Sequence, residues 1–249
     1  MYERPDVPKD SPHRNLIAII ILAVVAVAVG MLVSSLWTLA NTNSAMGSEE
    51  LAKVVKETDP SSDTIGAFAE ATGLTSTGDD IETTLFVVTP DGASAAAVYL
   101  YVANETQASS RLMQLANDAW LQAGEENYTV ADWYANQGAK GLAGAISSAA
   151  AVPVSHVVIM SETGWSSLVS IVSEGTASVS SNSAELIESI QSTDMDVTDL
   201  VDLAEKAINS AASVEVVEGV PTYEASDEAG NVWQQIDCTQ LAVMVGTLA

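Results

Sequence analysis

The sequence predicts an α/β fold in which a mixed β-sheet is sandwiched by helices and preceded by one transmembrane helix. Residues 16–39 form a single unbroken apolar run. Beyond that run, short segments rich in β-branched and aromatic residues alternate with segments that have helical apolar spacing and N-cap residues at their starts. Such alternation is typical of a sheet covered by helices, because each element must bury its apolar face against another layer.

The apolar run at residues 16–39 is long enough to cross a bilayer. No charged residue occurs between Arg14 and Glu49. A helix rises about 1.5 Å per residue, so about 20 such residues cross a hydrocarbon core ~30 Å thick. A cleaved signal peptide has a shorter apolar core and a small-residue cleavage site, whereas Trp37 lies where an interfacial aromatic belongs. We therefore expect a retained anchor in contact with the lipid bilayer.

Positive residues flank this run slightly more on its N-terminal side, where Arg4, Lys9 and Arg14 stand against Lys53 and Lys56 beyond it. The positive-inside rule then favours a cytoplasmic N-terminus and a single-pass protein of the cell membrane with an extracytoplasmic C-terminal domain. The expected parts are a cytoplasmic tail (1–15), a transmembrane anchor (16–39), a spacer with a short helix (40–79) and an extracytoplasmic α/β domain (80–249).

The chain is strongly acidic, with 33 Asp and Glu against 8 Lys and Arg and a net charge of −25. The cytoplasmic tail carries as many bases as acids, so this charge belongs to the remainder of the protein. A field of this sign repels nucleic acid and anionic lipid headgroups, and we expect no nucleic-acid partner. Solubility, or adaptation to a salty medium, explains the charge without any ligand. The lone Cys238 permits no internal disulfide.

Turn and cap residues place the individual elements of the external domain. In order, we expect a hairpin of residues 84–89 and 95–102 about Pro90, Asp91 and Gly92; a helix over 107–123; a helix to 149 opened by Thr129 and Asp132; a strand over 154–160; a helix over 165–172; helices capped by Asn182 with Glu185 and by Asp196 with Asp199; a strand over 214–217; a hairpin of 223–226 and 231–236; and a last helix capped by Asp237 with Gln240.

The chain offers few groups for catalysis or metal binding. His156 is the one histidine of the external domain, and a histidine that opens a strand is more often a satisfied core or rim residue than a catalytic one. One histidine and one cysteine cannot form a zinc site. Acidic clusters such as residues 79–82 and 194–199 lack the spacing of a calcium loop. We therefore expect no metal and no cofactor.

Two further features can be explained either by packing or by a function. Gly138, Gly141 and Gly144 could form a loop around Lys140, but their spacing of three favours a small-residue helix face that packs closely. The tryptophans Trp120, Trp133 and Trp165 could contact a partner protein, but aromatic residues of this kind more often belong to the core. Asn104 and Asn127 begin N-glycosylation sequons, which matter only in a host that glycosylates.

The order of segments resembles the LytR-CpsA-Psr (LCP) family, whose members transfer glycopolymers from a polyprenyl-pyrophosphate carrier onto the bacterial cell wall. The resemblance covers residues 80–249 and rests on a membrane anchor followed by residues 83–88 (TTLFVV), 98–102 (VYLYV), 128–138 (YTVADWYANQG), 152–160 (VPVSHVVIM), 165–172 (WSSLVSIV) and the C-terminal elements from residue 196 onward. It implies an LCP-like α/β domain and, in its ancestral form, a lipid-pyrophosphate site.

The catalytic residues of that family are missing from this sequence. The family has an Asp at the start of the first strand, where this chain has Thr83. A Pro-Arg-Asp follows the next strand in the family, and the corresponding positions hold Val102, Ala103 and Asn104. The family's later arginine-bearing stretch has no counterpart. Thr83, Ala103 and Asn104 are thus degenerate catalytic positions.

A pyrophosphate needs charge-assisted donors and a carboxylate-held Mg²⁺. Beyond residue 60 only Arg111, Lys140 and Lys206 carry a positive side chain, and Arg111 and Lys140 are the candidate anion-binding residues. We expect a non-catalytic binding or regulatory module in bacterial cell-envelope assembly, whose partner is a polyprenyl lipid or an envelope protein. An apolar groove lined by helices of residues 107–150 would hold it. The alternatives are a divergent glycopolymer transferase using Arg111 or Lys140, and a structural subunit of an envelope protein complex.

Overall fold

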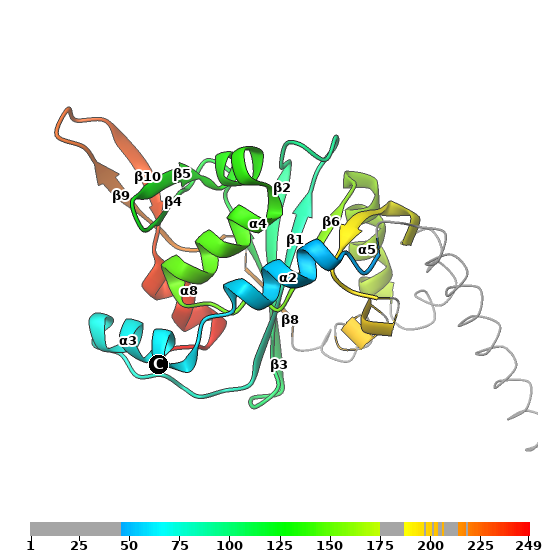
Figure 1. The fold of residues 1–249 in the computed structure, drawn as a ribbon, viewed down its shortest axis with the longest axis horizontal. Helices are drawn as coiled ribbons and strands as arrows, with labels where there is room; N and C mark the ends of the chain where they lie inside the picture. The colour runs from blue at the N-terminus through cyan, green and yellow to red at the C-terminus, as the bar shows by residue number, and fades with distance from the viewer. Residues whose placement is uncertain are drawn as a thin grey trace, which may run out of the picture.

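The computed structural model describes residues 46–174, 187–196, 198–200, 202–203, 206, 214–217 and 219–249. Its centre is a six-stranded mixed sheet with the strand order β7-β6-β1-β2-β3-β8 (Figure 1). β1, β2 and β3 form an antiparallel meander, β6 pairs parallel with β1, β8 pairs parallel with β3, and β7 pairs antiparallel with β6. The bounds are β1 (Ile81–Val88), β2 (Ala97–Asn104), β3 (Ser109–Leu115), β6 (His156–Met160), β7 (Ile190–Thr193) and β8 (Val214–Val217).

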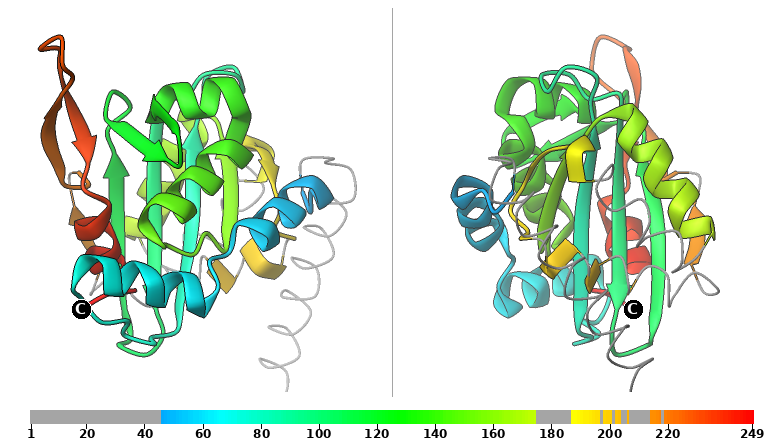
Figure 2. Two further views of the ribbon diagram at one scale, coloured as in Figure 1. Left: turned by 60° about the vertical axis from the view of Figure 1, so that its left-hand side comes forward. Right: turned by 90° about the vertical axis from the view of Figure 1, so that its right-hand side faces the viewer.

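Helices cover both faces of this sheet, which confirms the predicted α/β sandwich (Figure 2). Strand residues alternate between the two layers, since successive side chains point to opposite faces. Leu85 and Val87 pack in one core with α2 (Glu49–Thr58) and α4 (Val130–Ala150). Phe86, between them in sequence, packs in the other core with Trp165 of α5 (Glu162–Glu174). The ring of Trp165 also stacks on Tyr99 at 4.2 Å.

A second, four-stranded sheet has the order β5-β4-β10-β9 and lies beside the first. β9 (Thr222–Ser226) and β10 (Val232–Ile236) form the predicted C-terminal hairpin, which projects from the body of the molecule (Figures 1 and 2). β4 (Trp120–Ala123) and β5 (Glu126–Thr129) form another hairpin that joins it through β10. The predicted last helix follows as α8 (Cys238–Val245), with the Asp237 side chain accepting from the Gln240 N–H at 2.9 Å.

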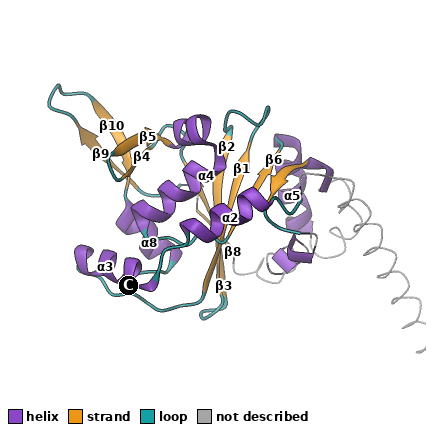
Figure 3. Ribbon diagram, in the orientation of Figure 1, coloured by secondary structure: helices purple, strands orange, loops and turns teal. Residues whose placement is uncertain are grey.

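The predicted helix over residues 107–123 is wrong, because this segment forms β3 and β4 (Figure 3). The spacing of its apolar residues misleads since β3 is covered on both faces. Met113 and Leu115 belong to the core under α4, while Leu112 packs into the opposite core. A strand buried on both sides shows no clean alternation, and its apolar residues can also match a helical period.

This error also removes half of the expected lining of an apolar groove, because residues 107–150 are not all helical. The layer between the sheet and α4 is filled by side chains with no exposed surface, among them Leu85, Leu100, Leu142 and Ile146. Side chains packed this closely leave few voids larger than a water molecule around them.

Residues 46–79 form two helices where the sequence predicted one. α2 begins at an N-cap, Ser48, and α3 (Ser62–Thr72) begins at a second N-cap, Ser61, which accepts from the Thr64 N–H. The Asp59–Asp63 break therefore ends one helix and starts another. α2 packs on α4, where the Ser147 hydroxyl donates to the Thr58 carbonyl. The stretch before α2 also pairs with the sheet edge, because the N–H groups of Gly47 and Ser48 donate to the carbonyls of Met195 and Thr193 at 3.0 and 2.9 Å.

The predicted caps and turns lie where expected. Asp91 Oδ1 accepts from the Ala93 and Ser94 N–H groups in the β1–β2 turn, and these bonds lower the pKa of Asp91 to about 2. Thr129 caps α4 by accepting from the Asp132 N–H at 3.0 Å. The carboxylates of Asp196 and Asp199 make reciprocal bonds to each other's backbone N–H groups. Asn182 and Glu185 lie outside the described residues.

The glycines of α4 have separate roles. Gly138 has φ 66° and ψ −168°, so it interrupts the helix and only a residue without Cβ adopts this conformation readily. The predicted small-residue helix face is therefore wrong at Gly138. It holds at Gly144, where an added Cβ would lie 3.4 Å from Thr58 Cγ2 of α2.

Among the described helices, none is long and apolar enough to cross a membrane. The predicted span at residues 16–39, and the tail before it, lie outside the described residues.

Candidate functional site

The sheet brings three of the predicted site residues onto one of its faces. Val102 of β2 pairs with Thr83 of β1 on one side and with Arg111 of β3 on the other. Cross-strand partners point to the same face, as do residues two apart on one strand. Thr83, Arg111 and Asn104 therefore share the face that α4 and α8 cover, whereas Ala103 faces the opposite layer and packs in the core under α5.

Thr83 offers no chemistry in its present surroundings. Its side chain has no exposed surface, and its hydroxyl has no hydrogen-bond partner in the described structure. Its backbone N–H and carbonyl bond instead to the Ser155 hydroxyl and N–H, at 3.2 and 2.8 Å. A buried neutral hydroxyl cannot replace the carboxylate that the resembled family uses at this position to hold a metal ion.

Asn104 organises the β2–β3 turn rather than an open site. Its Nδ2 donates to Asp79 Oδ2 at 2.8 Å, and its Oδ1 accepts from the Gln107 N–H at 2.9 Å. The Gln107 Nε2 donates to the same Asp79 oxygen at 2.6 Å. Both ends of the Asn104 amide are thus occupied, and the Asp79 oxygen that it contacts also accepts from Gln107.

Arg111 lies at a cavity of about 230 Å³ between the β2–β3 end of the sheet and α8. Its Nη1 donates to the Met244 carbonyl at 3.3 Å, which ties the guanidinium to the end of α8. It is the only charged side chain among the residues that line this cavity, which are Thr77, Val102, Asn104, Gln107, Ser109, Ser110, Arg111, Val243, Met244, Val245, Gly246, Leu248 and Ala249.

The second predicted anion-binding residue, Lys140, is not part of this cavity. It lies on α4 with its side chain 60% exposed, and its Nζ is 3.7 Å from Glu57 Oε2 of α2. The structure therefore does not bring Arg111 and Lys140 together at the cavity. A pair of cations that clamps one diphosphate needs both groups within reach of the same ligand.

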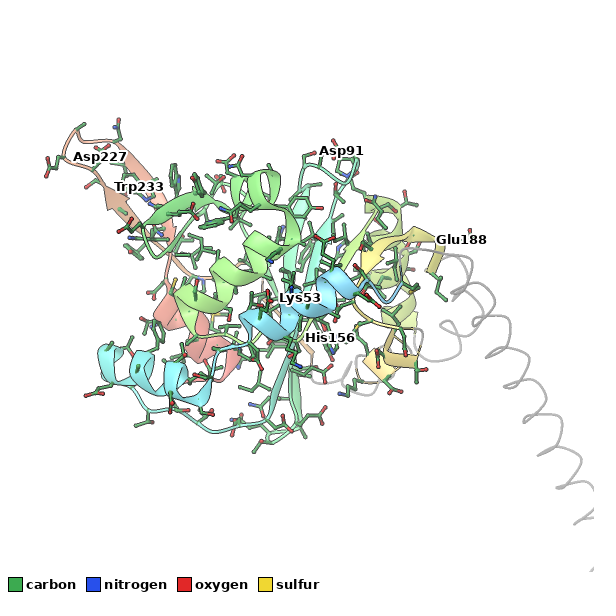
Figure 4. All side chains as sticks on the ribbon, viewed as in Figure 1. Lys53, Asp91, His156, Glu188, Asp227 and Trp233 are labelled. Carbon is green, nitrogen blue, oxygen red and sulfur yellow. The ribbon has the colours of Figure 1, made fainter. Side chains whose placement is uncertain are left out.

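A second polar cluster, which the sequence did not predict, lies at the end of the sheet where β1 and β6 begin (Figure 4 labels His156). His156 Nδ1 is 2.8 Å from Asp194 Oδ2, and its Nε2 is 3.9 Å from Glu82 Oε1. Lys206 Nζ approaches Glu82 Oε2 at 2.7 Å and Glu105 Oε1 at 3.1 Å. The described carboxylates of this cluster outnumber its cations, and both cations are already paired with them. The cluster is therefore a poor receptor for an anion.

The protonation of this cluster follows from its geometry. Burial acts to lower the pKa of His156, but the hydrogen bond to Asp194 and the charges of Asp194 and Glu82 outweigh it and raise the pKa above its ordinary value. The hydrogen bond to Glu82 raises the pKa of Lys206 against an opposing effect of burial. No described hydroxyl or thiol hydrogen-bonds the His156 Nε2, so the Asp–His pair lacks a nucleophile within reach. This agrees with the expectation of a satisfied rim histidine.

Only part of this cluster could have been predicted from the sequence. The parallel pairing of β1 and β6 brings Glu82 and His156, at the starts of these strands, to one end of the sheet. Nothing in the spacing places Lys206, which lies 124 positions from Glu82 in the chain. Trp133 is a core residue as predicted, since it is 3% exposed and donates to the Leu121 carbonyl. Trp165 of α5 is partly buried and packs against the second core. Within the described ranges, no group of three His, Cys, Asp or Glu side chains could hold a metal ion.

Comparison with known proteins gives a likeness of fold. No family model and no curated protein matches the sequence. Among solved structures, a LytR-Csp2A-Psr enzyme from Actinomyces oris matches with a TM-score of 0.54 and 11% identity, over 70% of this chain and 93% of that one. TagT bound to LI-WTA matches with a TM-score of 0.51 and 14% identity, over 68% and 89%. The chain therefore has an LCP-like fold.

Proposed function

We propose that this protein is a membrane-anchored, extracytoplasmic LCP-like protein that acts as a non-catalytic binding or regulatory module in bacterial cell-envelope assembly. The observation that carries the proposal is the state of the three degenerate catalytic positions. Thr83 is buried with an unpartnered hydroxyl, Ala103 has no functional group, and both ends of the Asn104 amide are occupied within the fold. None of the three supplies a metal-binding carboxylate or a guanidinium.

The charges around these positions support the same proposal. A transferred diphosphate requires several charge-assisted donors that act together. Arg111 is the single cation at the cavity, and the Met244 carbonyl already accepts from it. On the opposite face of the sheet, Lys206 is held between Glu82 and Glu105. In a chain of net charge −25, a diphosphate would meet repulsion at both places.

The packing of the core bears on the choice of ligand. A polyprenyl chain would need an elongated apolar cavity, and the layer between the sheet and α4 is filled by fully buried side chains. The cavity beside Arg111, at about 230 Å³, would admit only a small part of such a chain. These observations favour an envelope component that binds at the surface, such as a protein or a glycan, over a polyprenyl lipid.

The membrane anchor is proposed from residues 16–39, with the N-terminus in the cytoplasm and the domain outside the cell membrane. Proteolysis of intact cells whose outer layers have been made permeable tests this topology. The expected result is loss of the C-terminal domain with protection of an N-terminal tag. Protection of both ends, or release of the whole protein by alkaline carbonate, would contradict it.

The decisive experiment for the non-catalytic role measures release of polyprenyl monophosphate by the full chain, because cleavage of the pyrophosphate leaves one phosphate on the lipid and one on the glycopolymer. The protein is incubated with a glycopolymer linked to a polyprenyl pyrophosphate and with Mg²⁺, beside an active LCP transferase as the positive control. We expect no release above the protein-free background. Release by the wild type that disappears in the double variant Arg111→Ala, Lys140→Ala would establish the divergent transferase instead.

A further inference from the structure

One face of the four-stranded sheet carries a row of aromatic and amide side chains that the proposed function does not use. Gln235 of β10 pairs with Tyr223 of β9 on one side and with Trp120 of β4 on the other. Trp233, two residues before Gln235 on β10, lies on the same face. We call these four residues, Trp120, Tyr223, Trp233 and Gln235, the aromatic face.

The aromatic face has a defined internal geometry. The rings of Trp120 and Trp233 lie 5.8 Å apart at an interplanar angle of 46°. The Trp233 Nε1 donates to Gln235 Oε1 at 2.9 Å, which fixes the indole and the amide relative to each other. Gln235 itself is only 5% exposed, so its amide positions the Trp233 indole rather than facing the solvent.

The aromatic face is open to solvent at its outer side. Tyr223 is 52% exposed although it is a large aromatic residue on an edge strand. The hairpin that carries Tyr223 and Trp233 projects from the body, and Figure 4 shows Trp233 and Asp227 on this projection. Leu121, on the other side of β4, is fully buried against α4, so Trp120 points away from the main core.

The four residues of the aromatic face are uncharged, although the chain is strongly acidic. Its neighbours on the same side of β4 and β5 are Gln122 and Asn127, which pair with each other. The acidic residue of β9, Glu224, is paired with Gln234 and lies on the opposite side. Within β4, β9 and β10, the side that carries the rings therefore has no charged residue.

We propose that the aromatic face binds an uncharged polysaccharide chain. A pyranose ring has apolar C–H faces that stack on aromatic rings and hydroxyl groups at its edge that bond to amides. The aromatic face presents the rings, and the exposed Gln122, two residues after Trp120 on the same side of β4, presents an amide. The net charge of −25 disfavours anionic polymers, which leaves neutral sugars as the matching class. An extended peptide added to the free edge of β9 would use the backbone of that edge and would leave the rings unused. The inference is independent of the cavity at Arg111 and of whether the protein is an enzyme.

The test is isothermal titration of the full chain with cellohexaose and with chitohexaose, in a detergent that has no sugar headgroup. An oligogalacturonate of the same length is the anionic control. We expect saturable binding of at least one neutral hexaose and none of the oligogalacturonate. Tyr223→Ala should weaken binding about tenfold, because it removes one stacked ring from an exposed position without a structural role.

Val232→Ala is the matched control, since Val232 is 58% exposed on the same hairpin but its side chain points to the other face. It should bind like the wild type. Trp233→Ala should abolish binding, with circular dichroism used to check that the hairpin is intact. The proposal is overturned if neither neutral hexaose binds, if Tyr223→Ala binds as tightly as the wild type, or if Val232→Ala loses as much affinity as Tyr223→Ala.

Discussion

The carboxylate of Asp194 holds His156 at two points: Oδ2 lies 2.8 Å from the imidazole Nδ1, and Oδ1 accepts from the N–H of the next residue, Val157, at 2.7 Å. Asp194 follows β7 and His156 opens β6, so this carboxylate joins the ends of two strands. Its side chain is only 6% exposed, and a charge-assisted bond in such surroundings is stronger than one at the surface. The pair therefore stabilises the sheet end and favours the protonated form of the histidine.

Replacing Asp194 by Asn should lower the pKa of His156 and reduce the free energy of unfolding by about 1–3 kcal/mol, since the imidazolium loses its partner. The pKa is measured by NMR titration, with His156→Gln used to assign the signal, and stability by urea unfolding. Glu228→Gln removes an equal charge from the exposed tip of the C-terminal hairpin and should change neither quantity. An unchanged His156 titration in Asp194→Asn would contradict the assigned pairing.

The same pair makes a signed prediction for pH. Because the pKa of His156 is raised in the folded state, its contribution is fully present below the unfolded value of 6.5 and is lost as pH rises through the folded value. The difference in unfolding free energy between the wild type and His156→Gln should therefore be largest near about pH 6 and shrink toward about pH 9. A difference that grows with pH in this range would show that the neutral imidazole is the form that the fold stabilises.

Thr83 gives a test of the degenerate site through stability alone. Thr83→Val should be neutral or stabilise the protein by up to about 1 kcal/mol, because the buried hydroxyl has no partner to lose. Thr83→Asp, which restores the family's residue type, should cost about 3 kcal/mol or more, since it buries a carboxylate without a cation. Urea unfolding of both variants measures the contrast. Equal stability of Thr83→Asp and the wild type would mean that the site still accommodates an acid.

Two glycine-to-alanine changes should have opposite effects. Gly138→Ala should destabilise the protein by about 1–3 kcal/mol, because φ 66° with ψ −168° is accessible almost only to glycine. Gly66→Ala in α3 should stabilise it by about 0.5–1 kcal/mol, since the position is helical and an added Cβ meets nothing within 4 Å. Thermal unfolding followed by circular dichroism compares the two. A gain in stability for Gly138→Ala would show that α4 is continuous in solution.

Local signals in the sequence predicted those elements that depend on neighbouring residues. The Asp91 turn, the Thr129 cap and the Asp237 cap are each made within three residues of the named side chain, so their hydrogen bonds are encoded locally. The prediction for β3 was wrong because this strand depends on partner strands at both of its edges and on a core at each face. A short stretch of sequence contains none of these partners. The four-stranded sheet was missed for a related reason: β4 meets β10 through a single pairing more than a hundred residues away.

The candidate site divides in the same way. Thr83, Asn104 and Arg111 share a sheet face because they lie on consecutive strands of a meander, which the hairpin signals make predictable once β3 is recognised as a strand. The tie between Arg111 and the end of α8 could not be predicted, since it depends on how a C-terminal helix docks. The His156 cluster likewise needs Asp194 and Lys206, which the chain brings in from separate elements.

If residues 16–39 anchor the protein as proposed, the bonds from Gly47 and Ser48 to the edge near β7 limit how far the domain can move from the membrane. Residues 46–79 are folded onto the domain and do not lengthen its connection to the span. Only residues 40–45 remain as a linker, and they reach at most about 20 Å when fully extended. Such a short linker would keep the β7 edge of the domain facing the lipid headgroups. The projecting hairpin could then reach only a thin layer of space above the membrane.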